Sequence, residues 1–198
     1  MNPAMRTIVW DVDDTLNDLM RVWLEQWFLP RNRKVKTAYR DIKANPPHEI
    51  LGITMEDYLR SYDRFRLSGM YAAMPPLAEA VRWFKSKGRD FRHVALTAAP
   101  LSSAQESAAW VFRHFGKWIR TFHVVPSHRK GTRIPIYDSD KTDFIRRLDR
   151  CDVFVDDSPR NLAPAARFGV KCVLAPRPWN GEKGTLLEAL GKVRGMSI

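Results

Sequence analysis

Residues 7–16, TIVWDVDDTL, carry the clearest structural signal in the chain. Residues 7–10 form a short, mainly apolar run of the kind that becomes a buried strand in a parallel sheet. The run leads directly into Asp11 and Asp13, so carboxylates follow the predicted end of a strand. Because ligands of open parallel sheets bind beyond the carboxyl ends of the strands, this point is a candidate binding site.

Strands and helices are predicted to alternate over most of the remaining chain. Further strands are expected at residues 91–96, 121–125, 152–155 and 171–175. Apolar residues at helical spacing predict two helices that end at Gly88 and Gly116, and two more at residues 143–149 and 161–168. The predicted fold class is therefore α/β, with a Rossmann-like parallel sheet flanked by helices.

Residues 17–75 interrupt this alternation. They contain helical patches at 19–29 and 55–65, which are broken by Pro30 and by the Asn-Pro-Pro sequence at 45–47. We predict that they form a small helical cap inserted after the first strand. Residues 1–16 and 76–198 would then form the core domain.

The charge of the chain favours an anionic partner. Its 198 residues include 33 Lys and Arg against 22 Asp and Glu, which gives a formal net charge of +11. Residues 107–137 contain no acid, and they are either a solvated basic face or the source of a field that draws anions to a nearby site. Nucleic acid, phosphate esters and acidic surfaces are all compatible with this excess. No aromatic RNA-binding motif or GXXG loop is present, so nucleic acid is not the favoured partner.

Other classes of protein are disfavoured. No apolar run approaches the roughly 20 residues of a membrane-spanning helix, and the apolar stretch near the N-terminus is too short for a signal peptide. Cys151 and Cys172 have neither the number nor the spacing of a disulfide framework or metal site. We therefore expect a reduced, cytoplasmic protein with no membrane partner.

Three predicted strands lead into polar residues: Asp11 and Asp13, then Thr97, then Asp156 and Asp157. If these strands are neighbours, four carboxylates and a hydroxyl converge on one crevice. Buried carboxylates repel one another and their pKa values rise, and a bound hard cation removes that cost. Oxygen ligands of this kind suit Mg²⁺, which is the cofactor we expect.

These residues also carry a resemblance to a known family. The run from Ile8 to Leu16 resembles the first motif of the haloacid dehalogenase-like (HAD) hydrolase superfamily, hhhDxDx[TV][LV]. Ala95-Leu96-Thr97 looks like the second motif of that superfamily, Lys141 can serve as the third-motif lysine, and residues 153–157, VFVDD, look like the fourth motif. The matches follow in the right order and span most of the chain.

The resemblance implies a Mg²⁺-dependent phosphatase that forms an aspartyl-phosphate. Asp11 would be the nucleophile, and Asp13 would be the general acid and base. The metal would be held by Asp11, the backbone carbonyl of Asp13, and Asp156, with Asp157 in support.

The same resemblance implies a phosphate-binding group. Thr97 and the backbone N–H of Ala98 would hold phosphate oxygens, and Lys141 would neutralise their charge. Because the loop before Lys141 is long, Arg129 and Lys130 are alternatives for this last role.

A closer resemblance is to the 5'-nucleotidase branch that includes the deoxyribonucleotidases. It rests on short segments: LTAAP at 96–100, AWV at 109–111, DKT at 140–142, DDSP at 156–159 and RPWN at 177–180. Asp14 departs from the branch, which often has Gly there. The branch implies a nucleoside monophosphate as substrate. The aromatic residues of the cap would either stack on the base or only form core. Asn17 and Asp18, just past the first motif, would lie near the sugar or base. The alternatives are a sugar phosphate or other small phosphate ester, and a basic protein that acts on or binds nucleic acid.

Overall fold

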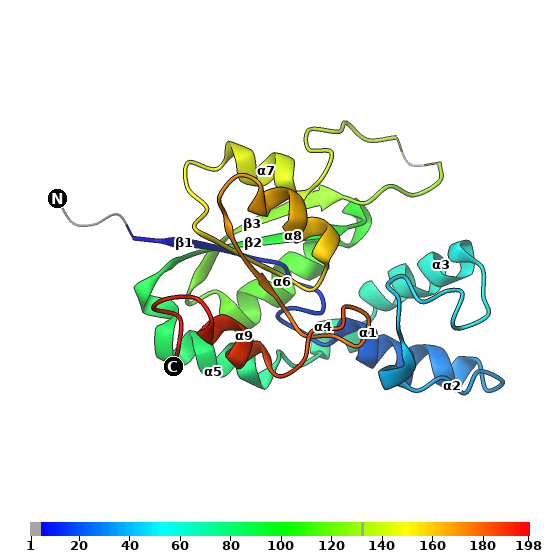
Figure 1. Cartoon of the computed structure of the whole chain (residues 1–198). Helices are drawn as coiled ribbons and strands as arrows, with labels where there is room; N and C mark the ends of the chain where they lie inside the picture. Colours follow the sequence, from blue (N-terminus) through cyan, green and yellow to red (C-terminus); the bar gives the residue numbers. More distant parts are fainter. Residues whose placement is uncertain (1–4, 132) are drawn as a thin grey trace.

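The sheet has five strands, and every neighbouring pair is parallel. The computed structural model describes residues 5–131 and 133–198, so residues 1–4 of the expected core and residue 132 of the basic segment lie outside it. The strand order is β3-β2-β1-β4-β5. The strands are β1 (Thr7–Trp10), β2 (Arg92–Ala99), β3 (Ile119–Pro126), β4 (Val153–Asp156) and β5 (Lys171–Leu174). All five expected strands are present, which confirms the predicted α/β class (Figure 1).

Alternation along the strands divides the core between the two faces of the sheet. Val9 pairs in register with Val94 on β2 and Phe154 on β4, and all three point to one face. Trp10 lies next to Val9 in the chain and points to the opposite face, as expected for a period of two. Both faces are apolar because helices cover both, which is why β1 has no polar side chain facing solvent.

Helices cover each face of the sheet (Figure 1). One layer contains α5 (Ala78–Lys87), α6 (Ala104–Phe115) and α9 (Leu186–Gly191), and the other contains α7 (Lys141–Arg147) and α8 (Pro159–Ala166). Two short 3₁₀ turns, η3 (Gly88–Asp90) and η4 (Leu101–Ser103), join helices and strands. Helix α7 begins two residues earlier than expected, because the Asp140 side chain caps it by accepting from Thr142 N at 2.7 Å and Asp143 N at 3.0 Å.

Helix α9 was not expected from the sequence. Its start carries a capping box, in which Thr185 Oγ1 accepts from Glu188 N at 3.2 Å and Glu188 Oε2 accepts from Thr185 N at 2.7 Å. The Thr-x-x-Glu spacing before an apolar run is a readable signal of a helix start, so this helix could have been predicted.

The inserted segment between β1 and α5 is helical, as predicted. It comprises α1 (Leu19–Val22), the π-helix η1 (Trp23–Phe28), α2 (Leu29–Arg31), the 3₁₀ turn η2 (Tyr39–Asp41), α3 (Met55–Arg66) and α4 (Gly69–Ala73). In Figure 1, α1, α2 and α3 lie to one side of the sheet, while α4 lies at the join. The expected break at Pro30 is not present, because α1, η1 and α2 follow one another directly from Leu19 to Arg31, and Phe28 and Leu29 before the proline keep right-handed helical backbone angles.

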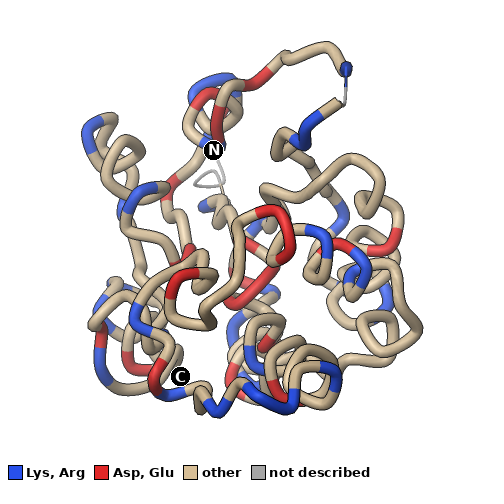
Figure 2. The backbone as a smooth tube through the Cα atoms, turned by 90° about the vertical axis from the view of Figure 1, so that its right-hand side faces the viewer, with Lys and Arg blue, Asp and Glu red and all other residues tan. Residues whose placement is uncertain are grey.

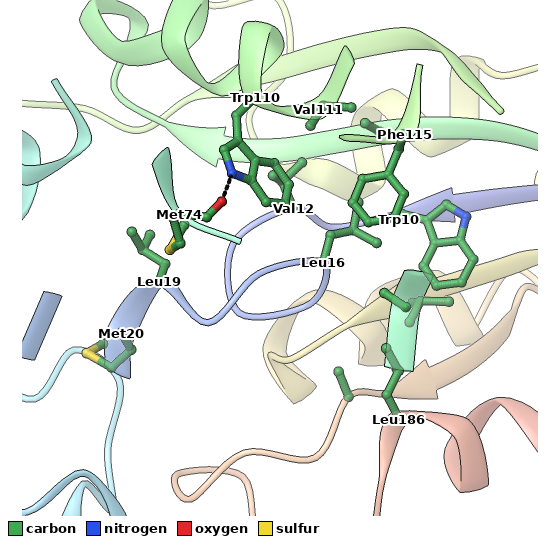
Figure 3. Packing of buried hydrophobic residues seen from close by; sticks show 14 of the residues in the cluster. Trp10, Val12, Leu16, Leu19, Met20, Met74, Trp110, Val111, Phe115 and Leu186 are labelled. Atoms are coloured by element: carbon green, nitrogen blue, oxygen red, sulfur yellow. Dashed lines mark hydrogen bonds between the residues drawn. The ribbon is translucent and has the colours of Figure 1, made fainter. Parts of the chain in front are cut away.

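The core is continuous from the sheet into the insertion. Leu16, Leu19 and Met20 belong to the same buried cluster as Trp10 (Figure 3). The indole N–H of Trp110 on α6 donates to the backbone carbonyl of Met74 at 2.7 Å, which ties the end of the insertion to the core (Figure 3). The insertion is therefore anchored at both of its ends.

Most aromatic side chains of the insertion build its own core. Trp23 is fully buried, and its ring meets those of Phe28, Tyr58 and Tyr62 at centroid distances of 4.9, 5.3 and 5.2 Å. Phe65 is also fully buried. Of the two roles considered for these aromatics, stacking on a substrate and packing in a core, packing accounts for most of them.

Charged residues are spread along the whole chain. Seen from the right-hand side of Figure 1, several acidic segments lie near the middle of the molecule, and both basic and acidic segments occur in its outer parts (Figure 2). Within the described ranges, no helix combines the length and apolarity that crossing a bilayer requires.

Candidate active site

The sheet order brings the predicted site residues together. β1 lies between β2 and β4, so the carboxyl ends of these three strands share one edge of the sheet. A cleft of about 390 Å³ opens at this edge. Its lining includes six of the expected site residues: Asp11, Asp13, Thr97, Ala98, Lys141 and Asp157. The seventh, Asp156, is fully buried beneath it and hydrogen-bonded to Lys141.

Lys141 forms ion pairs with two of the carboxylates. Its Nζ donates to Asp11 Oδ1 at 2.5 Å and to Asp156 Oδ2 at 2.7 Å. The ammonium is almost fully buried, with 4% of the side chain exposed. Burial lowers the pKa of Lys141, but the charges of Asp11 and Asp156 outweigh it and raise that pKa above its ordinary value. Lys141 is therefore charged at neutral pH.

Neither of the two alternatives to Lys141 is paired with the carboxylates that follow β1 and β4 in the structure. Arg129 makes a bidentate ion pair with Asp63 on α3, in which Nε and Nη2 lie 2.6 and 2.8 Å from the two carboxylate oxygens. Lys130 is exposed and does not line the cleft. Arg129 does line the cleft, but its charge is engaged with the insertion rather than with the acids of β1 and β4.

Residues after β4 and β5 donate hydrogen bonds that orient the carboxylates of Asp156 and Asp157. The Asn161 side chain donates to both oxygens of Asp156 at 3.0 and 3.1 Å, and Ser158 N donates to Oδ1 at 2.8 Å. The Trp179 indole N–H donates to Asp157 Oδ2 at 2.7 Å. No role was predicted for Asn161 or Trp179 from the sequence, although Trp179 lies in the RPWN segment at 177–180 that carries part of the resemblance.

The donor set suits a hard divalent cation. Carboxylate oxygens of Asp11, Asp156 and Asp157 lie within 4.8 Å of one another, and all three residues are buried. Burial raises the pKa of Asp11 well above its ordinary value, although Lys141 opposes this. Burial, followed by the charge of Asp156, raises the pKa of Asp157 to about 8. One ammonium does not balance three buried carboxylates, so these residues fit a cation such as Mg²⁺.

Asp13 points away from this group of three. Arg66, the last residue of α3, forms an ion pair with Asp13 Oδ2 through its Nη1. Asn17 Nδ2 donates to Asp13 Oδ1 at 3.1 Å, and the Tyr71 hydroxyl lies 3.4 Å from the same oxygen. Arg66 and Tyr71 belong to the insertion and were missed by the sequence reading, because neither has a distinctive local pattern.

Asp14 has a backbone conformation that explains why glycine often stands at this position in the branch that the sequence resembles. Its φ is +61°, a region that glycine adopts readily and other residues rarely. Asn17 Oδ1 accepts from Asp14 N at 3.0 Å, and Asp14 Oδ1 accepts from Met20 N at 2.9 Å. These bonds hold the turn that directs Asp13 toward the cleft. Burial raises the pKa of Asp14 to about 7, while Arg177 lowers it.

Arg177 clamps this turn from the C-terminal part of the chain. It donates to the backbone oxygen of Asp14 at 2.5 Å, to that of Asn17 at 3.0 Å, and to Asp18 Oδ1 at 3.1 Å. Asn17 is fully buried, and neither it nor Asp18 lines the cleft. The structure does not support the expectation that these two residues contact a sugar or base, because their side chains are hydrogen-bonded within the turn and to Arg177.

Comparison with known proteins supports the fold. No family model matches the sequence, and no curated protein matches it significantly. A haloacid dehalogenase-like hydrolase from Streptococcus pneumoniae is similar in structure, with a TM-score of 0.58, 12% identity, and coverage of 93% of this chain and 90% of that one. A haloacid dehalogenase-like hydrolase from Xanthomonas campestris gives 0.53, 15% identity, and coverage of 99% and 93%.

A third similar structure is a candidate HAD hydrolase from Bacillus subtilis, solved with bound magnesium. Its TM-score is 0.55 at 12% identity, and the match covers 92% of this chain and 91% of that one. At such identities the likeness establishes the fold alone. The chain therefore has the fold of HAD-like hydrolases, as the motifs implied, and its chemistry must be argued from its own residues.

Proposed function

We propose that the protein is a Mg²⁺-dependent phosphomonoester hydrolase that acts through an aspartyl-phosphate. One observation carries the proposal. The Asp11 carboxylate lies at the end of the central strand, in the lining of the cleft, where it accepts from Lys141 and lies within 4.8 Å of the Asp156 and Asp157 carboxylates. A nucleophile held in place beside buried positive charge, and open to a cleft, is what attack on a phosphate requires.

In the first half of the reaction, Asp11 attacks phosphorus and the bond to the leaving oxygen breaks. Asp13 donates a proton to that oxygen. In the second half, Asp13 takes a proton from water, the water oxygen attacks phosphorus, and Asp11 is released with inorganic phosphate. Thr15 Oγ1 donates to Asp11 Oδ2 at 3.2 Å and so helps to orient the nucleophile.

The metal would be held by Asp11, the backbone carbonyl of Asp13, and Asp156, with Asp157 in support. When bound, Mg²⁺ supplies positive charge that stabilises the phosphate oxygens. Lys141 adds charge to the same side of the site. Thr97 and the backbone N–H of Ala98 complete the phosphate-binding group from the end of β2.

A nucleoside monophosphate is the substrate that we favour. Tyr58 and Tyr62 of α3 line the cleft, with Met55, Leu59 and Pro46 beside them, so the wall opposite the carboxylates is partly apolar and aromatic. A nucleobase needs such a surface for stacking. The two tyrosine rings contact each other at 5.1 Å between centroids and are nearly buried, so a base would reach only the parts of them that line the cleft.

A smaller phosphate ester, such as a sugar phosphate, is the second candidate. The cleft volume of about 390 Å³ is at the low end for ligand sites, and Arg66, Arg129 and Arg160 line it together with the tyrosines. A compact, polar leaving group fits such a lining. Both substrates are small anions, and the two free cysteines accord with the expected cytoplasmic location.

The test is a screen for phosphate release with Mg²⁺ over nucleoside monophosphates and sugar phosphates. We expect the nucleotides to be hydrolysed with the higher kcat/KM. Faster turnover of sugar phosphates would replace the favoured substrate by the second candidate. A polynucleotide partner of the basic segment 107–137 would reveal itself by binding that weakens steeply with salt, whereas a single phosphate gives a shallow dependence.

A further inference from the structure

Arg66 is a buried arginine whose hydrogen bonds are incomplete. Its side chain is 7% exposed, and its Nη1 pairs with Asp13. Its Nε is buried and has no hydrogen-bond partner. The Tyr62 ring lies 5.0 Å from the guanidinium carbon and contributes a cation–π contact, which does not satisfy the N–H.

This arrangement is costly for a guanidinium. Arginine stays charged in proteins, so burial cannot be relieved by loss of a proton. A buried donor without an acceptor loses its hydrogen bonds to water and gains nothing in return. Because Arg66 lines the cleft, a movement of its side chain away from Asp13 would let the unpaired Nε–H meet an anionic oxygen there.

Resting on the proposed function, we propose that Arg66 binds the phosphate group of the substrate. The phosphate and the Asp13 carboxylate would compete for this one guanidinium. Asp11, which would carry the phosphoryl group, lies two residues from Asp13 and lines the same cleft as Arg66. Transfer to phosphate would give the guanidinium a bidentate partner and free Asp13 to face the leaving oxygen.

Other arginines of the cleft do not have this property. Both carboxylate oxygens of Asp63 are paired with Arg129, so that guanidinium is already in a bidentate ion pair. Arg160 is exposed, and water can satisfy its donors. Arg66 also comes from the insertion, so the exchange would couple phosphate binding to the position of α3 against the core.

The test is the binding of inorganic phosphate, by calorimetry at saturating Mg²⁺, to the protein and to Arg66→Gln, Asp13→Asn and the double variant. Competition predicts that Asp13→Asn binds phosphate about tenfold more tightly, because Arg66 no longer has to leave a carboxylate. It also predicts that Arg66→Gln weakens binding by a few-fold in the unaltered protein and by about ten times more in the Asp13→Asn background.

If Arg66 has a purely structural role, Arg66→Gln should weaken phosphate binding more in the unaltered protein than in the Asp13→Asn background. Removal of Arg66 would then expose the Asp13 charge and weaken phosphate binding in the unaltered protein, with little effect once Asp13 is Asn. That order would overturn the inference. If Arg66→Gln does not fold, the single variant Asp13→Asn still decides, because unchanged or weaker phosphate binding contradicts competition.

The matched control is Asp57→Asn, which removes the same charge from an exposed ion pair of α3 with Arg60. Its phosphate affinity should equal that of the unaltered protein. The outcome is independent of turnover. Phosphate binding with the predicted coupling, but no hydrolysis of any ester, would refute the proposed function and leave the inference standing, and turnover without the coupling would do the opposite.

Discussion

The Lys141 ammonium lies 2.5 Å from the Asp11 carboxylate, although 130 residues separate them in the chain. Lys141 is the first residue of α7, and Asp11 follows β1. The capping of α7 by Asp140 sets where that helix begins, and so it sets where the ammonium lies. A buried ion pair of this kind costs desolvation on both sides, and its presence in a cleft points to function rather than to stability.

Asp11→Asn should abolish phosphate release. The amide cannot act as the nucleophile, so we expect the rate to fall by at least about a thousandfold in the phosphatase assay with Mg²⁺. The circular dichroism spectrum should be unchanged, because Asn has the shape of Asp, its amide oxygen can still accept from Lys141, and Lys141 keeps Asp156 as an ion-pair partner. Asp149→Asn, which alters an exposed carboxylate, is the control. Retained turnover in Asp11→Asn would refute the assignment of the nucleophile.

Lys141→Met should lower kcat by about a hundredfold or more, because it removes the charge beside Asp11 and the phosphate. Lys130→Met, at an exposed lysine of the preceding loop, should stay within about twofold. Arg129→Met should have an intermediate effect, mainly on KM, since its partner is Asp63 on α3. Steady-state kinetics with one substrate compares all three. An effect of Lys130→Met equal to that of Lys141→Met would contradict the choice between them.

Mg²⁺ should stabilise the folded protein. A ligand that binds only the native state at 100 times its Kd adds about 2.7 kcal/mol to the free energy of unfolding. Differential scanning fluorimetry should therefore show that Tm rises with Mg²⁺ and returns to its initial value with a chelator. Asp156→Asn should remove most of the rise, and Asp149→Asn should retain it. A Tm that does not respond to Mg²⁺ would speak against a site at Asp11, Asp156 and Asp157.

Arg177→Met should destabilise the fold by about 3 kcal/mol, because three acceptors around Asp14 lose their donor. Arg167→Met, at an exposed position after α8, should change the free energy of unfolding by less than about 0.5 kcal/mol. Urea denaturation measures both. Equal stability of the two variants would show that the clamp on the turn contributes nothing.

His93 should contribute a part of the stability that is lost in mild acid, whereas the buried Asp14 and Asp157, whose pKa values are raised, contribute with the opposite sign. The His93 ring accepts from the Trp10 indole N–H at 3.0 Å and lies 2.8 Å from the Gly88 carbonyl, so it is held as the neutral form. Burial lowers the pKa of His93 to about 4, while the Gly88 hydrogen bond opposes this. The unfolded chain binds the proton first, so the contribution of His93 is full above about pH 6.5 and is lost as pH falls toward 4.

The size of this loss is about 3 kcal/mol, from a pKa difference of some two and a half units. The measurement is the free energy of unfolding between pH 7 and pH 4.5 in the protein and in His93→Gln. The variant should be less stable at pH 7 and show a shallower slope. The exposed His128→Gln is the control and should keep the original slope. A slope that His93→Gln leaves unchanged would contradict the assignment.

Much of the site could be predicted because it depends on a local pattern repeated in the right order. Asp11, Thr97 and Asp156 each lie at or next to the carboxyl end of an apolar strand, and adjacent parallel strands bring those ends to one edge. The helix at 186–191 was missed although its Thr-x-x-Glu signal is local. The expected contact of Asn17 with a sugar or base is not supported, because its side chain is buried and accepts from Asp14 N within the turn. The same side chain suits either use, so the sequence could not separate them.

The sequence by itself determined the α/β class, the helical insertion after the first strand and the residues at the strand ends, because periodicity and strand-end position are properties of neighbouring residues. Only the tertiary structure distinguished Lys141 from Arg129 and Lys130, because it pairs Lys141 with Asp11 and Asp156, pairs Arg129 with Asp63 and leaves Lys130 exposed. It also brought Arg66 to Asp13 across 53 positions and Arg177 to Asp14 across 163. Such contacts depend on how the insertion and the C-terminal loop pack against the sheet, and no local pattern encodes that packing.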